Sequence, residues 1–526
     1  MLSGARALLQ KENLPIALAA FAVLLVHSLY CYSVSDSRGV LVFSLVVSAL
    51  FLSLYIGVSV WRSRREVRIE ALFLIAVLCL GILYSAVFAP STVPDEVYHY
   101  QSSYYLSDLL LFSNPTVDSM PVRADDAHLI DFFLERGCLL TPDQYVGIFS
   151  SPLVVQDPSL VYIDPVSDFD FGSNPPQVKI ASALGISLAR LLHFGSYPTF
   201  YTGRLFNFMF FVALVYLAIR ITPVGKRAMI AVALLPMTLH VASSYSYDAG
   251  IIGFGFLLTG LCLRAIYGEG AISKRLCVSI ALVAVLLAPC KMVYAILMLM
   301  VLAVPSRRFS SRKNSYVFKG ATIVLAIASV VVLRLPSLLQ IVGFGSEAVG
   351  ESVVNVRGTE TGTFYSLFSV LSDPIDTILI FLRTFDSMGD MYIGTAIGRS
   401  LGWFQGDLLA PWYVAIAFLF VLVLSCVRWS KDCIQVSKRN RIFFATLVVV
   451  GWLAIMLSML TGWTFDSEVV IQGVQGRYLL PLLPLFLVAF QSKGIVASKD
   501  YSWTVVGLAG FFNCLYLMRL LTAVMS

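Results

Sequence analysis

Charged residues are scarce in this chain. They make up 13% of its 526 residues, whereas 58% of the residues are hydrophobic and the mean hydropathy is +0.83. Soluble domains contain roughly 25% charged residues, so the composition excludes a soluble globular protein and predicts an all-α integral membrane protein. Lys and Arg exceed Asp and Glu by 37 − 31 = 6. In a membrane protein such an excess reports topology, so it does not indicate nucleic-acid binding.

Cysteine pairs with ligand or disulfide spacing are also missing. The chain has nine cysteines but no CxxC pair and no other spacing typical of metal ligands. Most of them lie in apolar stretches, while Cys138 and Cys433 lie in loops predicted on opposite sides of the membrane. We therefore expect neither a disulfide framework nor a zinc site, and the histidines likewise lack ligand spacing. A glycine-rich phosphate loop and an internal repeat are absent from the sequence as well.

Apolar stretches of membrane-spanning character are, by contrast, abundant. A transmembrane helix needs roughly 20 apolar residues, and about thirteen transmembrane helices are predicted. They comprise residues 14–32, 40–61, 71–89, 201–221, 228–243, 249–266, a broken pair within 276–304, and residues 317–333, 411–427, 442–462, 478–490 and 503–524. The first stretch follows Arg6 and Lys11 as a signal peptide would. It exceeds the roughly 7–15 residues of a cleavable apolar core, so an uncleaved span is predicted.

Basic residues predict the orientation of these helices. The sequence RSRREVR places four arginines in one short loop after the second span. Such loops stay in the cytoplasm, which predicts a protein of the inner (cytoplasmic) membrane with a cytoplasmic N-terminus and a site that faces the periplasm or exterior. The predicted divisions are residues 1–90 (three spans), 91–197 (an external subdomain with the acidic motif), 198–334 (spans), 335–409 (a second external segment with an interfacial helix) and 410–526 (spans with an external loop at 463–477).

The apolar run 276–304 carries basic clusters at both of its ends. A single crossing would place one cluster outside, so we expect two short helices that meet at residues 289–291. Each is too short to cross the bilayer fully. Their junction is therefore expected at membrane depth, on the floor of a cavity.

Ionisable residues gather on the predicted external face. The motif PDEVYH, directly after the third span, supplies Asp95 and Glu96 as candidate catalytic residues. A carboxylate pair suits proton removal from a hydroxyl, because one group accepts the proton while the other raises its pKa or binds the substrate. Cations on the same face suit a lipid phosphate, and aromatic rings suit a sugar or lipid. The candidate substrate-binding residues are His99, Asp248, Lys291, Trp403, Gln475, Arg477 and Tyr478.

Each charged candidate also has a purely structural interpretation. Asp95 and Glu96 would be favourable in the first turn of a helix, and Asp248 would cap one. Lys291 would extend along apolar surface toward water, and Arg477 would anchor a helix at the interface. The residues alone leave these alternatives open.

Six motifs in order carry a resemblance to a known family. They are PDEVYH, NPPQVKIASALGISLARLL, LLPMTLHVASSYSYDAG, APCKMVYAILML, IGRSLGWF and GVQGRYLLPLLPLFL. From about residue 70 to 490 the chain resembles the bacterial membrane proteins of domain-of-unknown-function family 2142, which in turn resemble the GT-C glycosyltransferases. That resemblance implies a catalytic base at Asp95 with Glu96 as its partner, and donor-phosphate contacts at Lys291 and Arg477. The acidic loop follows the third span here and the first in GT-C enzymes, which makes the first two spans an addition.

The expected function is transfer of a sugar from a polyprenyl-phosphate donor to a hydroxyl of an external cell-envelope glycan, such as O-antigen or another surface polysaccharide. The expected partners are this donor, the glycan acceptor and the lipid bilayer. No cofactor is required, although a divalent cation is compatible with the chemistry. The alternatives are a glycan polymerase and a transporter or flippase for a lipid-linked or anionic solute, in which the acids would form a proton relay. Transporters favour charges near the midplane and repeated halves, and the sequence indicates neither.

Overall fold

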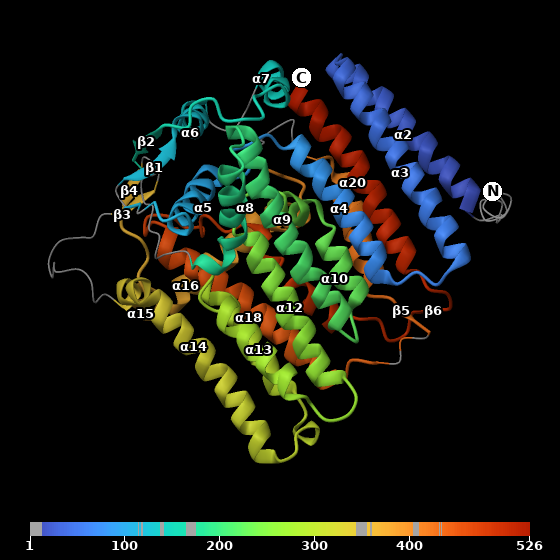
Figure 1. Ribbon diagram of the computed structural model, residues 1–526. Coiled ribbons are helices and arrows are strands. Elements are labelled where there is room, and N and C mark those ends of the chain that lie inside the picture. The colour runs from blue at the N-terminus through green and yellow to red at the C-terminus, as the bar shows by residue number, and fades with distance from the viewer. Residues whose placement is uncertain are drawn as a thin grey trace.

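The computed structural model describes residues 13–113, 115, 116, 119–136, 141–164, 175–342, 355–357, 360–402, 410–430, 432 and 434–525 (Figure 1). This part of the chain is mostly helical, with three two-stranded sheets in addition. Cys138 and Cys433 lie outside it, and the other seven cysteines are free thiols.

Eight helices of the described chain are long and apolar enough to cross a membrane. They are α2 (Asn13–Ser35), α3 (Arg38–Arg64), α4 (Ile69–Val87), α9 (Ser196–Ile221), α12 (Asp248–Tyr267), α14 (Arg312–Val342), α18 (Lys438–Trp463) and α20 (Ser502–Met525). Each coincides with a predicted span. The multi-helix membrane character that the composition predicts is therefore confirmed.

The expectation of about thirteen spans is wrong for the residues that the structure describes. The remaining predicted segments form α10 (Lys226–Ala233) with α11 (Pro236–Ala242), α13 (Lys274–Leu287) with the 3₁₀ helix η2 (Met292–Ala303), α17 (Trp412–Ser425), and η5 (Gly476–Leu479) with α19 (Leu483–Ala489). Proline explains most of the breaks, because it lacks an N–H and clashes with the preceding turn. Pro236 begins α11, Pro289 lies between α13 and η2, and Pro484 lies in the first turn of α19. With 14 residues, α17 spans only about 21 Å.

Helix α12 forms the centre of the helix array. Its apolar window is 94% buried, and it packs against α9, α13 and η2. A Cβ at Gly260 would lie 2.9 Å from the carbonyl oxygen of Ala218 on α9, so the missing side chain lets the two helices approach closely. Helix α14 lies at the edge of the array (Figure 1), and only 11% of its apolar window is buried.

The segment after α4 folds into a small subdomain at one end of the array. It contains α5 (Glu96–Leu110), β1 (Met120–Arg123), α6 (Ala124–Arg136), α7 (Pro142–Phe149), β2 (Leu160–Ile163), η1 (Pro176–Val178) and α8 (Ile180–Leu191). Strands β1 and β2 pair antiparallel, with Met120 opposite Ile163. Aromatic side chains including Tyr100, Tyr104 and Phe200 form its core. Short helices and a strand pair together form this segment, and the strand pair was not anticipated.

Further short elements follow along the chain. They are η3 (Ser306–Arg308), β3 (Asn355–Arg357), β4 (Glu360–Gly362), α15 (Leu367–Ser372), α16 (Pro374–Ile397), β5 (Arg428–Trp429) and β6 (Val496–Ala497). The amphipathic stretch expected to form an interfacial helix lies in α16, whose first turn is capped by the Asp373 carboxylate. Helix α16 packs against η5 and thereby positions the residues that follow Gln475.

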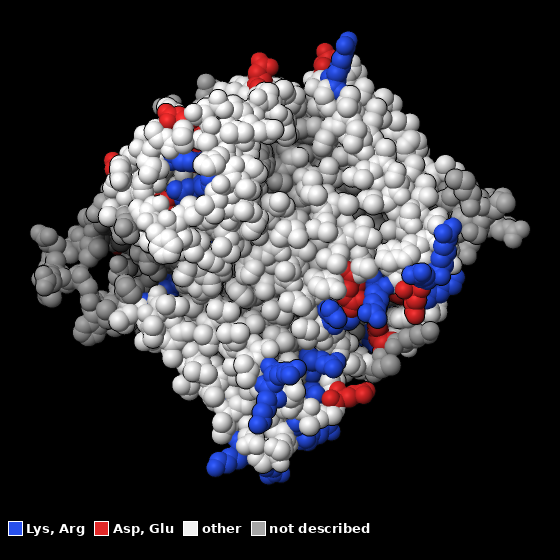
Figure 2. All heavy atoms as spheres, viewed as in Figure 1, with Lys and Arg blue, Asp and Glu red and all other residues white. Residues whose placement is uncertain are grey.

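Lys and Arg gather at the end of the array opposite to the subdomain. Figure 2 shows them along the lower and lower-right margin, where Figure 1 places the α3–α4, α12–α13 and η3–α14 connections. Arg64, Arg65, Lys274, Arg275 and Arg312 lie in these connections or in the helix turns directly beside them. The basic clusters thus share one end, as the predicted topology requires, while a cytoplasmic location of that end stays a prediction.

Candidate active site

Asp95 occupies an unusual position at the start of α5. It is the N-cap residue, yet its side chain makes no capping hydrogen bond, and its backbone has a left-handed φ of 61°. This conformation costs a non-glycine residue about 1–3 kcal/mol and is typical of functional sites. The Asp95 side chain is 59% exposed. Helix capping therefore does not account for this carboxylate.

Glu96 is, by contrast, buried and fully engaged. Its side chain is inaccessible to solvent and forms a bidentate ion pair with Arg204, at 2.8 Å from Nε to Oε1 and 2.6 Å from Nη2 to Oε2. Oε2 also accepts the Ser91 N–H at 2.9 Å, and Oε1 accepts the Tyr245 N–H at 3.1 Å. Four N–H groups thus occupy the carboxylate and tie the acidic motif to α9. This geometry suits positioning of the backbone around Asp95 and leaves Glu96 no free lone pair directed at a substrate.

Asp95 lies at the edge of a charged cluster formed by Asp248, Lys291 and Arg477. The Lys291 Nζ lies 2.8 Å from Asp248 Oδ1, and Arg477 Nε lies 3.4 Å from Asp248 Oδ2. Arg477 Nη2 in turn lies 3.9 Å from Asp95 Oδ2. The two cations and the single Asp248 carboxylate give the cluster a net charge of 2 − 1 = +1. The cluster is therefore electropositive beside an exposed carboxylate.

Two helix breaks and the start of α12 bring the cluster together. Asp248 is the first residue of α12, Lys291 lies in the break between α13 and η2, and Arg477 lies in η5. Each of these three residues lies at a helix start, in a break or in a short helix. Their side chains, far apart in sequence, therefore meet at one point. The expected break around residues 289–291 is present, and η2 continues from it as a 3₁₀ helix.

Arg334 supports this break from α14. It lies at a kink in that helix and donates from Nε to the Pro289 carbonyl at 2.6 Å and from Nη2 to the Cys290 carbonyl at 2.7 Å. Backbone carbonyls freed at a helix break need such donors at membrane depth. Arg334 is not among the site residues predicted from the sequence. A lone arginine near the end of an apolar span was the signal available.

His99 and an additional lysine lie beside the cluster. The His99 ring contacts the Tyr247 ring edge-on at 4.5 Å between centroids. Burial, together with the nearby positive charge of Lys179, holds the pKa of His99 well below its ordinary value, so the imidazole is neutral at pH 7. Lys179, which the sequence analysis also missed, is buried and hydrogen-bonded to the Ser102 hydroxyl.

Tyr478 and Gln475 are the remaining candidates that the structure describes. Lys291 Nζ lies over the Tyr478 ring at 4.3 Å and over the Tyr247 ring at 5.0 Å from the centroids. Gln475 is the half-buried N-cap of η5, and its side chain makes no capping bond. Trp403 lies outside the described residues.

A cavity of about 500 Å³ adjoins the Lys291 side of the cluster. Lys291, Arg334 and the rings of Tyr247 and Tyr478 line its polar part, and apolar side chains of α18, such as Ile455, line the rest. The cavity therefore combines cations with an apolar wall beside the poorly buried α14. Within the described residues, no group of three His, Cys, Asp or Glu side chains has the arrangement of a metal site.

Residues 164–486 match a family of known proteins described as "Predicted membrane protein (DUF2142)". The chain belongs to this family. The match confirms the family resemblance read from the motifs and the multi-pass membrane character. It includes Asp248, Lys291 and Arg477 of the cluster and begins after the acidic motif. No curated protein and no solved structure matches the chain.

Proposed function

We propose that this DUF2142 protein is a membrane glycosyltransferase of the GT-C type. It would move a sugar from a polyprenyl-phosphate donor to a hydroxyl of an external glycan. The observation that carries the proposal is the pairing of an exposed, uncapped carboxylate, Asp95, with the electropositive cluster of Lys291, Asp248 and Arg477. A base next to a phosphate-binding group is what displacement of a lipid phosphate by a hydroxyl requires.

Asp95 is the proposed general base. The acceptor oxygen attacks the anomeric carbon, the bond from that carbon to the phosphate oxygen breaks, and the hydroxyl proton passes to the Asp95 carboxylate. Its exposure and the absence of a capping bond leave the carboxylate available for this role. Glu96, held by Arg204, is proposed to position Asp95 and not to touch the substrate.

Lys291 and Arg477 are proposed to bind the donor phosphate. Their shared partner Asp248 holds both side chains in place and leaves a net positive charge for the incoming anion. The adjoining cavity supplies an apolar wall for the prenyl chain next to these cations. Charge-assisted hydrogen bonds to a phosphate contribute more than neutral ones, so these side chains favour a phosphorylated lipid over a neutral one.

Binding of polyprenyl phosphate to the purified protein tests the donor site without knowledge of the sugar. Lys291→Met should weaken this binding by roughly tenfold to a hundredfold, as expected for a lost charge-assisted hydrogen bond. Lys313→Met, in the basic first turn of α14, is the matched control and should leave the affinity unchanged. Unphosphorylated polyprenol should bind both variants and the wild type equally. Equal affinity of Lys291→Met and wild type for polyprenyl phosphate would mean that Lys291 only pairs with Asp248.

A further inference from the structure

A second cavity lies between α4 and α9 and shares no lining residue with the cavity at Lys291. Its volume is about 410 Å³. Ile82 of α4, Leu205 of α9 and Phe149 at the end of α7 line it with apolar side chains, and Ile82 is 62% exposed. Because α4 and α9 are both long and apolar enough to cross a membrane, the apolar lining that they supply suits the hydrocarbon of a bilayer. An apolar chain of a lipid is the occupant that this environment offers.

A polar hollow of about 290 Å³ lies in the subdomain next to it. Asp125 and His128 of α6, Gln156 and the ring of Tyr197 line this hollow, and none of its lining residues within the described part of the chain is Lys or Arg. The Asp125 Oδ2 accepts the Gln156 N–H at 2.6 Å, which fixes the carboxylate in the wall. Hydroxyl groups suit this lining, since the carboxylate accepts hydrogen bonds and the imidazole and the amide both donate and accept them around one aromatic ring.

The two hollows meet at one wall. Tyr197 lines both of them, and the loop that separates them contributes Leu153 to the apolar cavity and Pro152 to the polar one. This loop is held across the start of α9, because the Gly195 N–H donates to the Leu153 carbonyl at 2.9 Å. A Cβ at Gly195 would overlap the Pro152 carbonyl oxygen, so only glycine allows the loop to lie so close.

We propose that the two hollows form one site for a lipid-anchored sugar, with the apolar chain between α4 and α9 and the sugar ring against Tyr197 beside Asp125. One continuous wall joins an apolar cavity to a hydroxyl-binding hollow, and a molecule that fills both must be an amphiphile. If the proposed transfer reaction is correct, this amphiphile is the acceptor, which is then a glycolipid and not a free glycan.

The charge of the walls distinguishes this site from the donor site. In the polar hollow a phosphate head group would meet the Asp125 carboxylate, with no lysine or arginine among the lining residues that the structure describes. Arg204 lines the apolar cavity, but its guanidinium donates to Glu96 and to the Phe88 and Ala89 carbonyls. An uncharged, hydroxyl-rich head group therefore fits better than a phosphate. Arg204 also links the wall of this cavity to the acidic motif that carries Asp95.

Photo-crosslinking with dodecyl glucoside that bears a diazirine in its chain tests the site on the full-length protein in lipid nanodiscs. Crosslinks should concentrate on peptides of α4, α7 and α9. Excess dodecyl glucoside should compete, whereas free glucose and dodecyl phosphate should compete poorly. Crosslinks spread evenly over the outward helix faces would mean non-specific lipid contact only and would overturn the proposal. Equal competition by dodecyl phosphate would overturn the assignment of the head group.

Variants in the two hollows provide the second arm of the test. Ile82→Trp adds bulk from an exposed position to the apolar cavity and should lower specific crosslinking roughly tenfold. His128→Ala and Asp125→Asn should weaken competition by dodecyl glucoside and leave that by dodecanol unchanged. Val278→Trp, an exposed apolar position on α13 outside both hollows, is the control and should behave as wild type. Wild-type crosslinking by Ile82→Trp would contradict the site.

The outcome is separable from the proposed transfer reaction, because crosslinking needs neither a donor nor catalysis. Specific crosslinking together with absent sugar transfer would retain the glycolipid site and reject the transferase function. Transfer with no specific crosslinking would retain the function and reject this site as the acceptor site.

Discussion

Two adjacent acids, Asp95 and Glu96, have opposite environments. Glu96 lies in a buried ion pair with Arg204, 108 residues along the chain, and receives four N–H donors. Asp95 is exposed, is strained at φ 61° and, among the described residues, lies 3.9 Å from its ion-pair partner Arg477. In the local sequence the two residues are adjacent carboxylates with nothing to distinguish them. Their contacts in the folded protein give them different environments. We infer that Glu96 anchors the loop and that Asp95 acts as the general base.

Replacement of Glu96 should therefore affect stability first. In Glu96→Gln one anionic partner of the buried Arg204 guanidinium is lost, and removal of one partner of a buried pair typically costs about 3–5 kcal/mol. The thermal unfolding temperature of the purified protein should fall. Asp95→Asn is the matched control and should unfold as the wild type does. Equal unfolding temperatures for Glu96→Gln and wild type would show that the pair does not anchor the loop.

The sequence allowed part of the site to be predicted. The topology placed Asp95, Asp248, Lys291 and Arg477 on one face, and the structure brings these four side chains into one cluster. The pairing of Glu96 with Arg204 was not predictable, since nothing in the local pattern around either residue marks a partner so far along the chain. Lys179 was missed for the same reason, because a lysine in a short polar stretch has no periodicity that reports its burial.

Broken helices are the elements that build the site. The segments around Pro236, Pro289 and Pro484 have the composition of membrane spans, but each proline interrupts the helix. Hydropathy counts apolar residues and does not register the interruption, which is why it overestimated the number of spans. The break at residues 289–291 was anticipated from the charges at both ends. Arg334, which satisfies its free carbonyls, lies in a different helix and was not.

Gly476 should be essential to the geometry of η5. A Cβ at this position would overlap the Tyr392 carbonyl oxygen of α16, so Gly476→Ala forces η5 away from α16 and displaces Arg477. We expect a loss of about 1–3 kcal/mol of stability, as for other overpacked sites, together with reduced transfer activity. Thermal unfolding and transfer assays measure the two effects.

Gly462→Ala in α18 is the control for this substitution. A Cβ there has no neighbour within 4 Å, and alanine is favoured over glycine in a helix by up to about 1 kcal/mol. This variant should be as stable as wild type or slightly more so. If Gly476→Ala behaved in the same way, the close contact between η5 and α16 would not be what positions Arg477.

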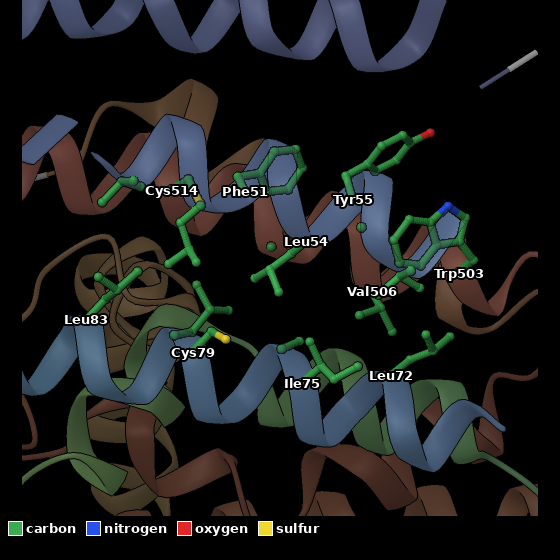
Figure 3. Close-up of a pocket in the computed structure, with 17 residues that line it drawn as sticks. Phe51, Leu54, Tyr55, Leu72, Ile75, Cys79, Leu83, Trp503, Val506 and Cys514 are labelled. Atoms are coloured by element: carbon green, nitrogen blue, oxygen red, sulfur yellow. The ribbon is translucent and has the colours of Figure 1, made fainter. Parts of the chain in front are cut away.

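The whole molecule has a basic end and an end with the subdomain and the candidate site. The basic connections lie together in Figure 2, which is the distribution that the positive-inside rule associates with the cytoplasmic side. A third region, lined by α3, α4 and α20, is an apolar groove of about 70 Å³ (Figure 3). Phe51, Ile75 and Val506 lie on its walls, and the face is accordingly suited to hydrocarbon and not to water.

Thiol labelling tests the predicted orientation in a variant that lacks the nine native cysteines. Ser63→Cys, at the basic end of α3, should be shielded from an impermeant reagent in intact cells and labelled after permeabilisation. Tyr162→Cys in β2, an exposed position of the subdomain, should be labelled in intact cells. Labelling of both positions from outside would refute the division of the molecule into a cytoplasmic and an external end.

The most direct test of the account is the rate of sugar transfer from polyprenyl phosphate to the surface acceptor by Asp95→Asn, normalised to folded protein in the membrane. Asparagine keeps the size of the side chain and removes the proton acceptor, so the rate should fall by roughly 10²–10⁴-fold, with an unchanged unfolding temperature. Asp143→Asn, an exposed acid in the first turn of α7, controls for a general helix-terminus effect, which is about 0.3–1 kcal/mol. It should transfer sugar at the wild-type rate. Transfer by folded Asp95→Asn at the wild-type rate would contradict the assignment of Asp95 as the catalytic base.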